Sequence, residues 1–192
     1  MIILLNFPRL WPHLVVFLSL STKNPIHEDL ERWKTSYLKG KKIGAIKAIL
    51  FLLVFQPEFR NLFYLRCGHI GKLLALCLPP MDTLFLATKD VGPGLFVQHG
   101  FATILLAKKV GSNCWINQQV TVGYDAHHGC PTIGNDVTIN AGAKIIGGVT
   151  IGDRVVIGAN AVVVRNVPSD VTVVGVPGRI VRRNGIRVDE KL

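Results

Sequence analysis

One histidine of the chain stands where it could act as a general base. His99 follows Gln98 and precedes Gly100, in a stretch rich in glycine and in aliphatic or aromatic residues. Because imidazole titrates near neutral pH, one side chain can take up a proton and later return it. A lone histidine is more often a surface or hydrogen-bonded residue, so this assignment depends on what surrounds it.

A second group of polar side chains lies between Tyr124 and Pro131. It contains Asp125, His127, His128 and Cys130. With His99 these side chains could in principle bind zinc, but they lack the spacing that a zinc site requires, so we expect no metal. Asp125 could also be a simple turn residue, and the two histidines an exposed loop tip.

The element that must position these groups is a repeat of six residues. From Val91 onward an aliphatic residue recurs every six positions, with one slip and one longer interruption, and a small or β-branched residue follows four positions later. The aliphatic positions are Val91, Val97, Ile104, Val110, Ile116, Val122, Ile133, Ile139, Ile145, Ile151, Ile157 and Val163. A period of six fits neither a helix nor a continuous strand. It predicts short strands joined by turns, wound into a parallel β-solenoid with three hexapeptides in each coil.

Eighteen residues per coil place equivalent hexapeptides in vertical columns. His99, Gln118, Ala141 and Ala159 then form one column, in which small residues lead away from a candidate base. Such a strip can hold an extended ligand, and the pantetheine arm of coenzyme A is one. Gln118 could equally be a structural hydrogen-bonding residue.

The longer interruption, from Val122 to Ile133, is five residues in excess of the repeat. It predicts a loop that leaves from a neighbouring corner of the solenoid. A loop beside a candidate base on a rigid scaffold is a plausible acceptor-binding element.

Residues 91–182 resemble the hexapeptide-repeat acyltransferases. The segments 94–99, 117–123 and 174–181 are similar to serine acetyltransferases and to the related O-acetyltransferases of capsule and exopolysaccharide gene clusters. The resemblance implies a left-handed parallel β-helix, a homotrimer, and acetyl-CoA bound along the helix between two subunits. It also implies His99 as the catalytic base, with Ala141, Gly142, Ala159 and Arg179 as coenzyme-binding positions.

The mechanism implied is direct acyl transfer. His99 takes the proton of an acceptor hydroxyl as its oxygen attacks the thioester, and backbone N–H groups near Gly123 and Tyr124 meet the oxyanion. The candidate acceptor contacts are Gln98, Gln118, Asp125, His127 and His128.

Two departures bear on the acceptor. Serine acetyltransferases have an aspartate before the catalytic histidine and a second histidine before a proline, where this chain has Gln98 and Cys130. A zwitterionic serine would lose electrostatic partners that a neutral sugar does not need. We therefore expect a sugar acceptor in capsular or exopolysaccharide assembly. There are two alternatives. One is serine O-acetylation in cysteine biosynthesis, and the other is a non-catalytic trimeric scaffold.

The first part of the chain predicts α-helices. They are expected from Asn24-Pro25 to near Gly40, from Ile43 to Phe55, from Pro57 to Cys67 and from Lys72 to Leu78. The expected divisions are an apolar segment at 1–24, a helical region at 25–80, the β-helix at 81–176 and a basic tail at 177–192.

The apolar run at 1–20 is interrupted by Pro8, Arg9 and Pro12, so we expect neither a membrane span nor a signal peptide. The expected location is the cytoplasm. Basic residues scattered among the apolar helices leave peripheral contact with the inner face of the membrane as an option.

Composition narrows the classes of protein and of partner that the chain fits. Hydrophobic residues make up 49% of the 192, which excludes a globally disordered chain. The net charge of +10 indicates an anionic partner, but without a nucleic-acid-binding motif we expect no nucleic acid. The four cysteines lack disulfide or metal spacing and are expected to be reduced.

Overall fold

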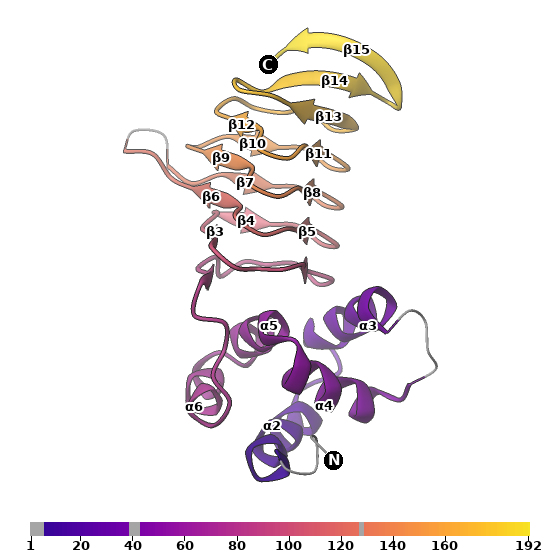
Figure 1. The fold of residues 1–192 in the computed structure, drawn as a ribbon, viewed down its shortest axis with the longest axis vertical. Coiled ribbons are helices and arrows are strands. Elements are labelled where there is room, and N and C mark those ends of the chain that lie inside the picture. The colour runs from indigo at the N-terminus through magenta and orange to yellow at the C-terminus, as the bar shows by residue number, and fades with distance from the viewer. Residues whose placement is uncertain (1–5, 39–42, 127–128) are drawn as a thin grey trace. The chain divides into compact units, whose positions relative to one another are not determined.

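The computed structural model describes residues 6–38, 43–126 and 129–192. It divides into two compact units, Met1–Asp82 and Thr83–Leu192. Figure 1 shows helices in the first unit and stacked strands in the second.

The described part of the helical unit contains five helices. They are α2 (Phe7–Ser19), α3 (Ile26–Tyr37), α4 (Ala45–Phe55), α5 (Pro57–Cys67) and α6 (His69–Cys77). The N-terminal segment, expected only as an apolar stretch, is helical from Phe7. Pro8 is tolerated there because it lies in the first turn, and Pro12 lies inside the helix. No single helix in the described ranges is long and apolar enough to cross a membrane, although α4 and α5 pass that test as a pair bent by 115°.

The core of the helical unit combines aromatic packing with a buried ion pair. Trp33 packs edge-on against Phe59, with ring centroids 5.2 Å apart. Arg66 Nε donates to Asp29 Oδ2 at 2.7 Å, with both side chains almost fully buried.

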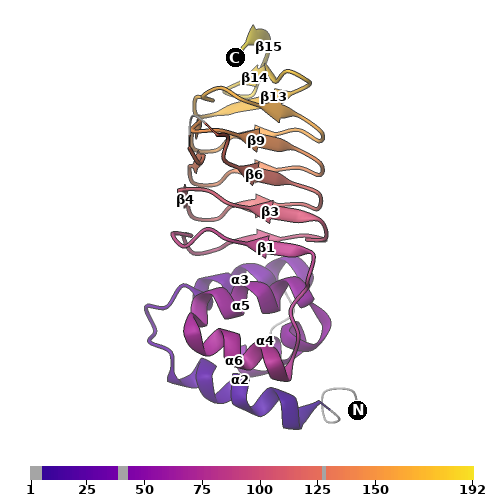
Figure 2. The same ribbon diagram turned by 90° about the vertical axis from the view of Figure 1, so that its left-hand side faces the viewer.

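The solenoid unit consists of three parallel sheets, each formed by one strand per coil (Figure 2). The first sheet contains β1 (Leu84–Leu86), β3 (Thr103–Leu105), β6 (Thr121–Gly123), β9 (Lys144–Ile146) and β12 (Val162–Val163). The second contains β4 (Lys109–Val110), β7 (Thr132–Ile133) and β10 (Thr150–Ile151). The third contains β2 (Phe96–Val97), β5 (Trp115–Ile116), β8 (Thr138–Ile139), β11 (Val156–Ile157) and β13 (Val171–Val174). The predicted fold class, a left-handed parallel β-helix preceded by α-helices, is confirmed.

Residues 177–192 were expected as a basic tail but continue the third sheet. β14 (Arg179–Arg183) pairs antiparallel with β13, and β15 (Ile186–Lys191) pairs antiparallel with β14. Two ion pairs, Arg179–Asp189 and Arg183–Glu190, connect these strands. The hairpin thereby covers the hydrogen-bonding edge of the last coil.

The predicted inward positions are buried, with one exception. Eleven of the twelve aliphatic residues are at most 6% exposed, but Ile104 is 42% exposed. Leu105 points inward in its place, because the register pairs Leu105 with Val122. The segment from Val97 to the next inward residue is therefore two residues longer than a hexapeptide.

Glycines at the ends of the second-sheet strands allow the coils to stack closely. A Cβ on Gly111 would lie 2.4 Å from the carbonyl oxygen of Gly134, closer than any side chain tolerates. At the next corner, side chains bridge successive coils: Asn135 Oδ1 accepts from Ser112 N–H, and Asp153 Oδ1 accepts from Asn135 N–H.

Candidate active site

Strand register places the predicted column at one corner of the solenoid. We name the turns from the third sheet to the first the His99 corner. Gln118, Ala141 and Ala159 each lie two residues after a paired strand residue of the third sheet, and His99 occupies the same position after Val97. Gly175, two residues after Val173, extends this column to the last coil.

Backbone hydrogen bonds show which residue is stacked at the lower end of the column. Gly142 N–H donates to Gln118 O, Asn160 N–H donates to Ala141 O, and in the same pattern Gln119 N–H donates to Phe101 O. Phe101, and not His99, is thus stacked directly against Gln118. His99 projects from the two extra residues of this turn.

His99 is exposed and has a φ of 53°, in the left-handed region that few side chains adopt. Within the described ranges the imidazole makes no hydrogen bond to another side chain or to the backbone. Gln98, directly before it, is half-buried and its N–H donates to Ile116 O. The ring is therefore open to a ligand at the foot of the column.

Phe101 was missed as a site residue by sequence reasoning. Its side chain is 45% exposed beside His99, and Ile104 and Phe85 are exposed on the adjoining first sheet. The signal was the slip in the repeat after Val97, which marks an enlarged turn.

Lys144 connects two turns of the His99 corner. Its Nζ donates to Gln119 O at 2.6 Å and to Gly142 O at 2.9 Å. Gly142 itself has a φ of 74°, and a Cβ there would overlap Asn160 Oδ1. The backbone thus explains this glycine independently of any coenzyme contact.

The other predicted residues lie at a different corner. We name the turns from the first sheet to the second the loop corner. Gly123 ends β6, the exposed Tyr124 follows it, and Asp125 forms an antiparallel bridge with Gly129. The first sheet separates this corner from His99 within one chain. His127 and His128 lie outside the described residues.

Asp125 faces a hollow at the loop corner. The hollow has a volume of about 500 Å³ and is lined by Asp125, Ile146 to Val149 and Val164 to Asn166. The Asp125 carboxylate comes so close to Gly147 that a Cβ there would lie 3.0 Å from Oδ2. Cys130 is half-buried in the same loop.

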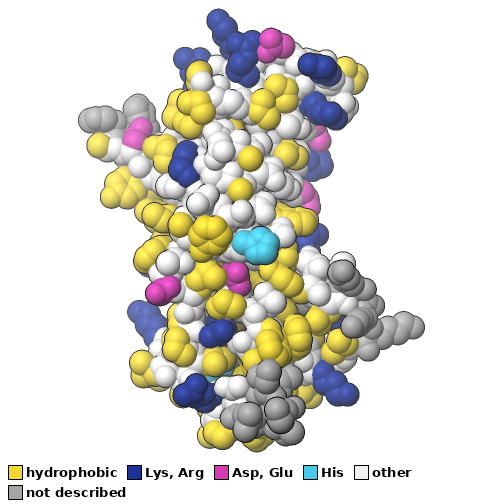
Figure 3. All heavy atoms as spheres, viewed as in Figure 1, with side chains coloured by type: hydrophobic (Ala, Val, Ile, Leu, Met, Phe, Trp, Pro, Cys, Tyr) yellow, Lys and Arg dark blue, Asp and Glu magenta, His cyan; other side chains and the backbone are white. Residues whose placement is uncertain are grey.

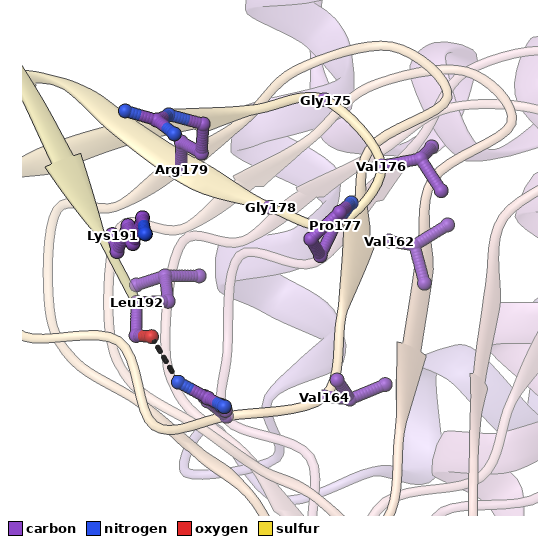
Figure 4. Close-up of a pocket in the computed structure, with 10 residues that line it drawn as sticks. Val162, Val164, Gly175, Val176, Pro177, Gly178, Arg179, Lys191 and Leu192 are labelled. Carbon is purple, nitrogen blue, oxygen red and sulfur yellow. Dashed lines mark hydrogen bonds between the residues drawn. The ribbon is translucent and has the colours of Figure 1, made fainter.

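A second hollow, of about 660 Å³, lies at the upper end of the column (Figure 4). Gly175 lines it, together with the cationic residues Arg165, Arg179 and Lys191. Arg179 is already paired with Asp189, with Nη2 2.6 Å from Oδ1, and Arg165 Nη1 donates to Leu192 O at 2.6 Å. The column therefore leads from an exposed imidazole to a mainly cationic end.

No group of three His, Cys, Asp or Glu side chains converges as a metal site in the part of the chain that the structure describes. Burial raises the pKa of the Cys67 thiol to about 12, which makes it a poor nucleophile near neutral pH.

The six-residue repeat matches a known family in part of its length. Residues 130–165 match the family described as bacterial transferase hexapeptide (six repeats). The match lies within the solenoid and covers 36 of the 192 residues.

Curated proteins similar to this chain are named serine acetyltransferases. The enzyme of Synechococcus elongatus is 46% identical over 103 residues, which are 52% of this chain and 42% of the relative. That of Staphylococcus aureus strain Mu50 is 43% identical over 102 residues, 51% of this chain and 48% of the relative. The chain thus spans less than half the length of these curated relatives.

Among solved structures, the serine acetyltransferase of Neisseria gonorrhoeae in complex with serine is similar, with a TM-score of 0.64 and 25% identity. The match covers 82% of this chain and 68% of that one. The likeness to serine acetyltransferases supports the wider transferase group and gives no support to a capsular or exopolysaccharide branch.

Proposed function

We propose that the chain transfers an acetyl group from acetyl-CoA to a hydroxyl acceptor, with His99 as the general base. The observation that carries the proposal is the exposed imidazole at the foot of a column of small residues with a cationic upper end. The relatives named serine acetyltransferase support the same chemistry.

The reaction needs one group that moves a proton twice. Neutral His99 accepts the acceptor's hydroxyl proton while the oxygen forms a bond to the thioester carbonyl carbon. The carbon–sulfur bond then breaks, and protonated His99 returns the proton to the leaving thiolate. The products are an O-acetyl ester and free coenzyme A, with no covalent enzyme intermediate.

The column supplies a place for the acetyl donor. Small side chains at Ala141, Ala159 and Gly175 let an extended pantetheine arm approach the backbone. Arg165, Arg179 and Lys191 would meet the coenzyme phosphates, since guanidinium and ammonium groups form charge-assisted hydrogen bonds with them. For Arg179 this contact competes with its ion pair to Asp189.

A second copy of the chain would complete the site. Gly123, Tyr124 and Asp125 lie at the loop corner, apart from His99 in the same chain. A homotrimer, which the resemblance implies, would place the loop corner of one copy beside the His99 corner of the next. Backbone N–H groups near Gly123 and Tyr124 would then serve the oxyanion from the partner.

Serine is the acceptor that the comparisons favour. The relatives are named serine acetyltransferases, and the Neisseria structure holds serine. A sugar hydroxyl is the second candidate, because Gln98 and Cys130 carry no charge for an amino acid and the exposed Phe101 offers an apolar face for a sugar ring.

The test follows thiol release from acetyl-CoA with L-serine and, separately, with a panel of hexoses and hexosides. We expect release with one acceptor class, and a loss of about 10²- to 10⁴-fold in kcat in His99→Ala. His69→Ala, which removes an exposed histidine of the helical unit, is the matched control and should keep full activity. Full activity in His99→Ala would refute the assigned base, and no release with any acceptor would favour a scaffold role.

A further inference from the structure

Helix α2 presents apolar side chains to solvent along one side. Phe7, Trp11, Val15 and Leu18 are 50–62% exposed, and their spacing of four, four and three residues aligns them on one stripe. The buried residues Leu10, His13 and Phe17 lie on another side of the same helix. The helix is therefore apolar both toward its own core and toward solvent.

Helix α6 has a similar outward stripe. Ile70, Leu73 and Leu76 are 51%, 67% and 82% exposed, while Gly71 and Leu74 are buried. Gly71 fits so closely against the Tyr64 backbone that a Cβ would lie 2.3 Å from the Tyr64 carbonyl oxygen, which fixes the outward face of α6. Because α2 packs against α6, the two stripes belong to neighbouring helices. We name their seven exposed residues the α2–α6 surface.

The charges on the helices that carry this surface, and on α4, have one sign. Helices α2, α4 and α6 contain no Asp or Glu, and each carries one exposed cation: Arg9, Lys47 and Lys72. The acidic residues within described helices of this unit lie on α3 and α5. Residues 1–82 together have 11 Lys and Arg against five Asp and Glu. Figure 3 shows hydrophobic side chains interspersed with Lys and Arg on the face of the helical unit in view.

We propose that the α2–α6 surface docks on an anionic lipid membrane. The seven exposed side chains are large and apolar and lie on two helices that contact each other, and apolar residues gathered in this way mark interaction sites. Apolar side chains inserted at the headgroup boundary, with a tryptophan among them, are the recognised means by which amphipathic helices bind to lipid. Helices free of acidic residues and bearing cations favour negatively charged headgroups over neutral ones. This inference does not depend on the acceptor or on catalysis.

The experiment is flotation of the full chain with vesicles of phosphatidylcholine alone and of phosphatidylcholine mixed with phosphatidylglycerol, without acetyl-CoA. We expect binding to the mixed vesicles that weakens as salt is raised. A blue shift of tryptophan emission on binding should disappear in Trp11→Phe, because Trp33 is fully buried and Trp115 lies on β5 of the solenoid unit.

Leu73→Asp/Leu76→Asp tests the surface directly, and both positions are exposed enough for the variant to fold. It should reduce binding at least about ten-fold, since it removes inserted apolar groups and adds repulsion from anionic lipid. Ile186→Asp, at an equally exposed apolar residue of the solenoid, should bind as the original chain does.

Four results would overturn the proposal. The first is no binding to the mixed vesicles, and the second is equal binding by the double variant. The third is a lipid-free assembly that dissociates in the double variant during sedimentation, which would show that a second copy covers this surface. Equal binding to both vesicle types would overturn the choice of an anionic membrane.

Discussion

His13 is a buried histidine whose protonation opposes folding. It is 0% exposed, and its Nε2 lies 2.9 Å from the Tyr64 hydroxyl, which itself donates to Leu78 O. Burial lowers the pKa of His13 below its ordinary value of 6.5, and nearby Arg60 acts in the same direction. The native state therefore holds this imidazole neutral.

We predict that acidification destabilises the helical unit through His13. Above pH 6.5 both states are neutral at this site, whereas below it the unfolded chain binds a proton that the folded chain does not. The free energy of unfolding should fall as pH drops, by up to about 1.4 kcal/mol per pH unit for one proton. Denaturant unfolding between neutral and mildly acidic pH measures this slope. His13→Gln should flatten it, and the exposed control His69→Gln should leave it unchanged.

The residues of the candidate site differ in how far the sequence could predict them. Counting coils grouped Gln118, Ala141 and Ala159 at one corner, because a regular repeat fixes which residues stack, but it put His99 in the position that Phe101 occupies. Phe101 could not be found this way, since the count breaks down inside an enlarged turn. The pair Arg179–Asp189 was also out of reach, because it depends on an antiparallel return that lies beyond the six-residue period.

At the scale of elements, the solenoid tolerates no side chain where glycines stack at the ends of second-sheet strands. We predict that Gly111→Ala lowers the free energy of unfolding by about 1–3 kcal/mol, because its Cβ would press on the Gly134 backbone. Gly123→Ala is the matched control for stability, since a Cβ there meets nothing within 4 Å. Thermal unfolding of both variants measures the difference, and equal loss in the two would contradict the steric explanation.

The sequence predicted features set by neighbouring residues better than features set by pairing between coils. The Asn24-Pro25 start signal was correct, since α3 begins at Ile26 and Asn24 Oδ1 accepts from the Ile26 N–H. Ile104 was assigned inward because it keeps a nearly regular spacing, and this was wrong. Pairing between coils decides which residue points inward, and one sequence does not display that pairing.

At the scale of the whole molecule, the two corners argue for sites shared between copies. We predict that mixing two inactive variants, His99→Ala and Asp125→Ala, restores part of the activity. In a mixed trimer about a quarter of the interfaces would join an intact His99 corner to an intact loop corner. Co-refolding the two variants and measuring thiol release from acetyl-CoA tests this expectation.

The control for this experiment is a mixture of His99→Ala with His99→Gln, in which no intact site can form. Failure of the first mixture to exceed this control would show that each copy works alone. Full activity of Asp125→Ala by itself would remove the loop from the acceptor site.

The number of coils in the solenoid sets the distance between the His99 turn and the cationic hollow. Each coil adds a fixed height of about 4.8 Å, so the reach from the His99 turn to the cationic hollow is counted in whole steps. This reach changes only with the number of whole coils, because extra residues within a coil bulge into a turn, as after Val97, and leave the next inward position buried. The distance between His99 and the cationic hollow therefore takes only certain values. Under the proposed function, an acetyl donor whose arm does not match that distance would have either its thioester away from His99 or its phosphates away from the hollow.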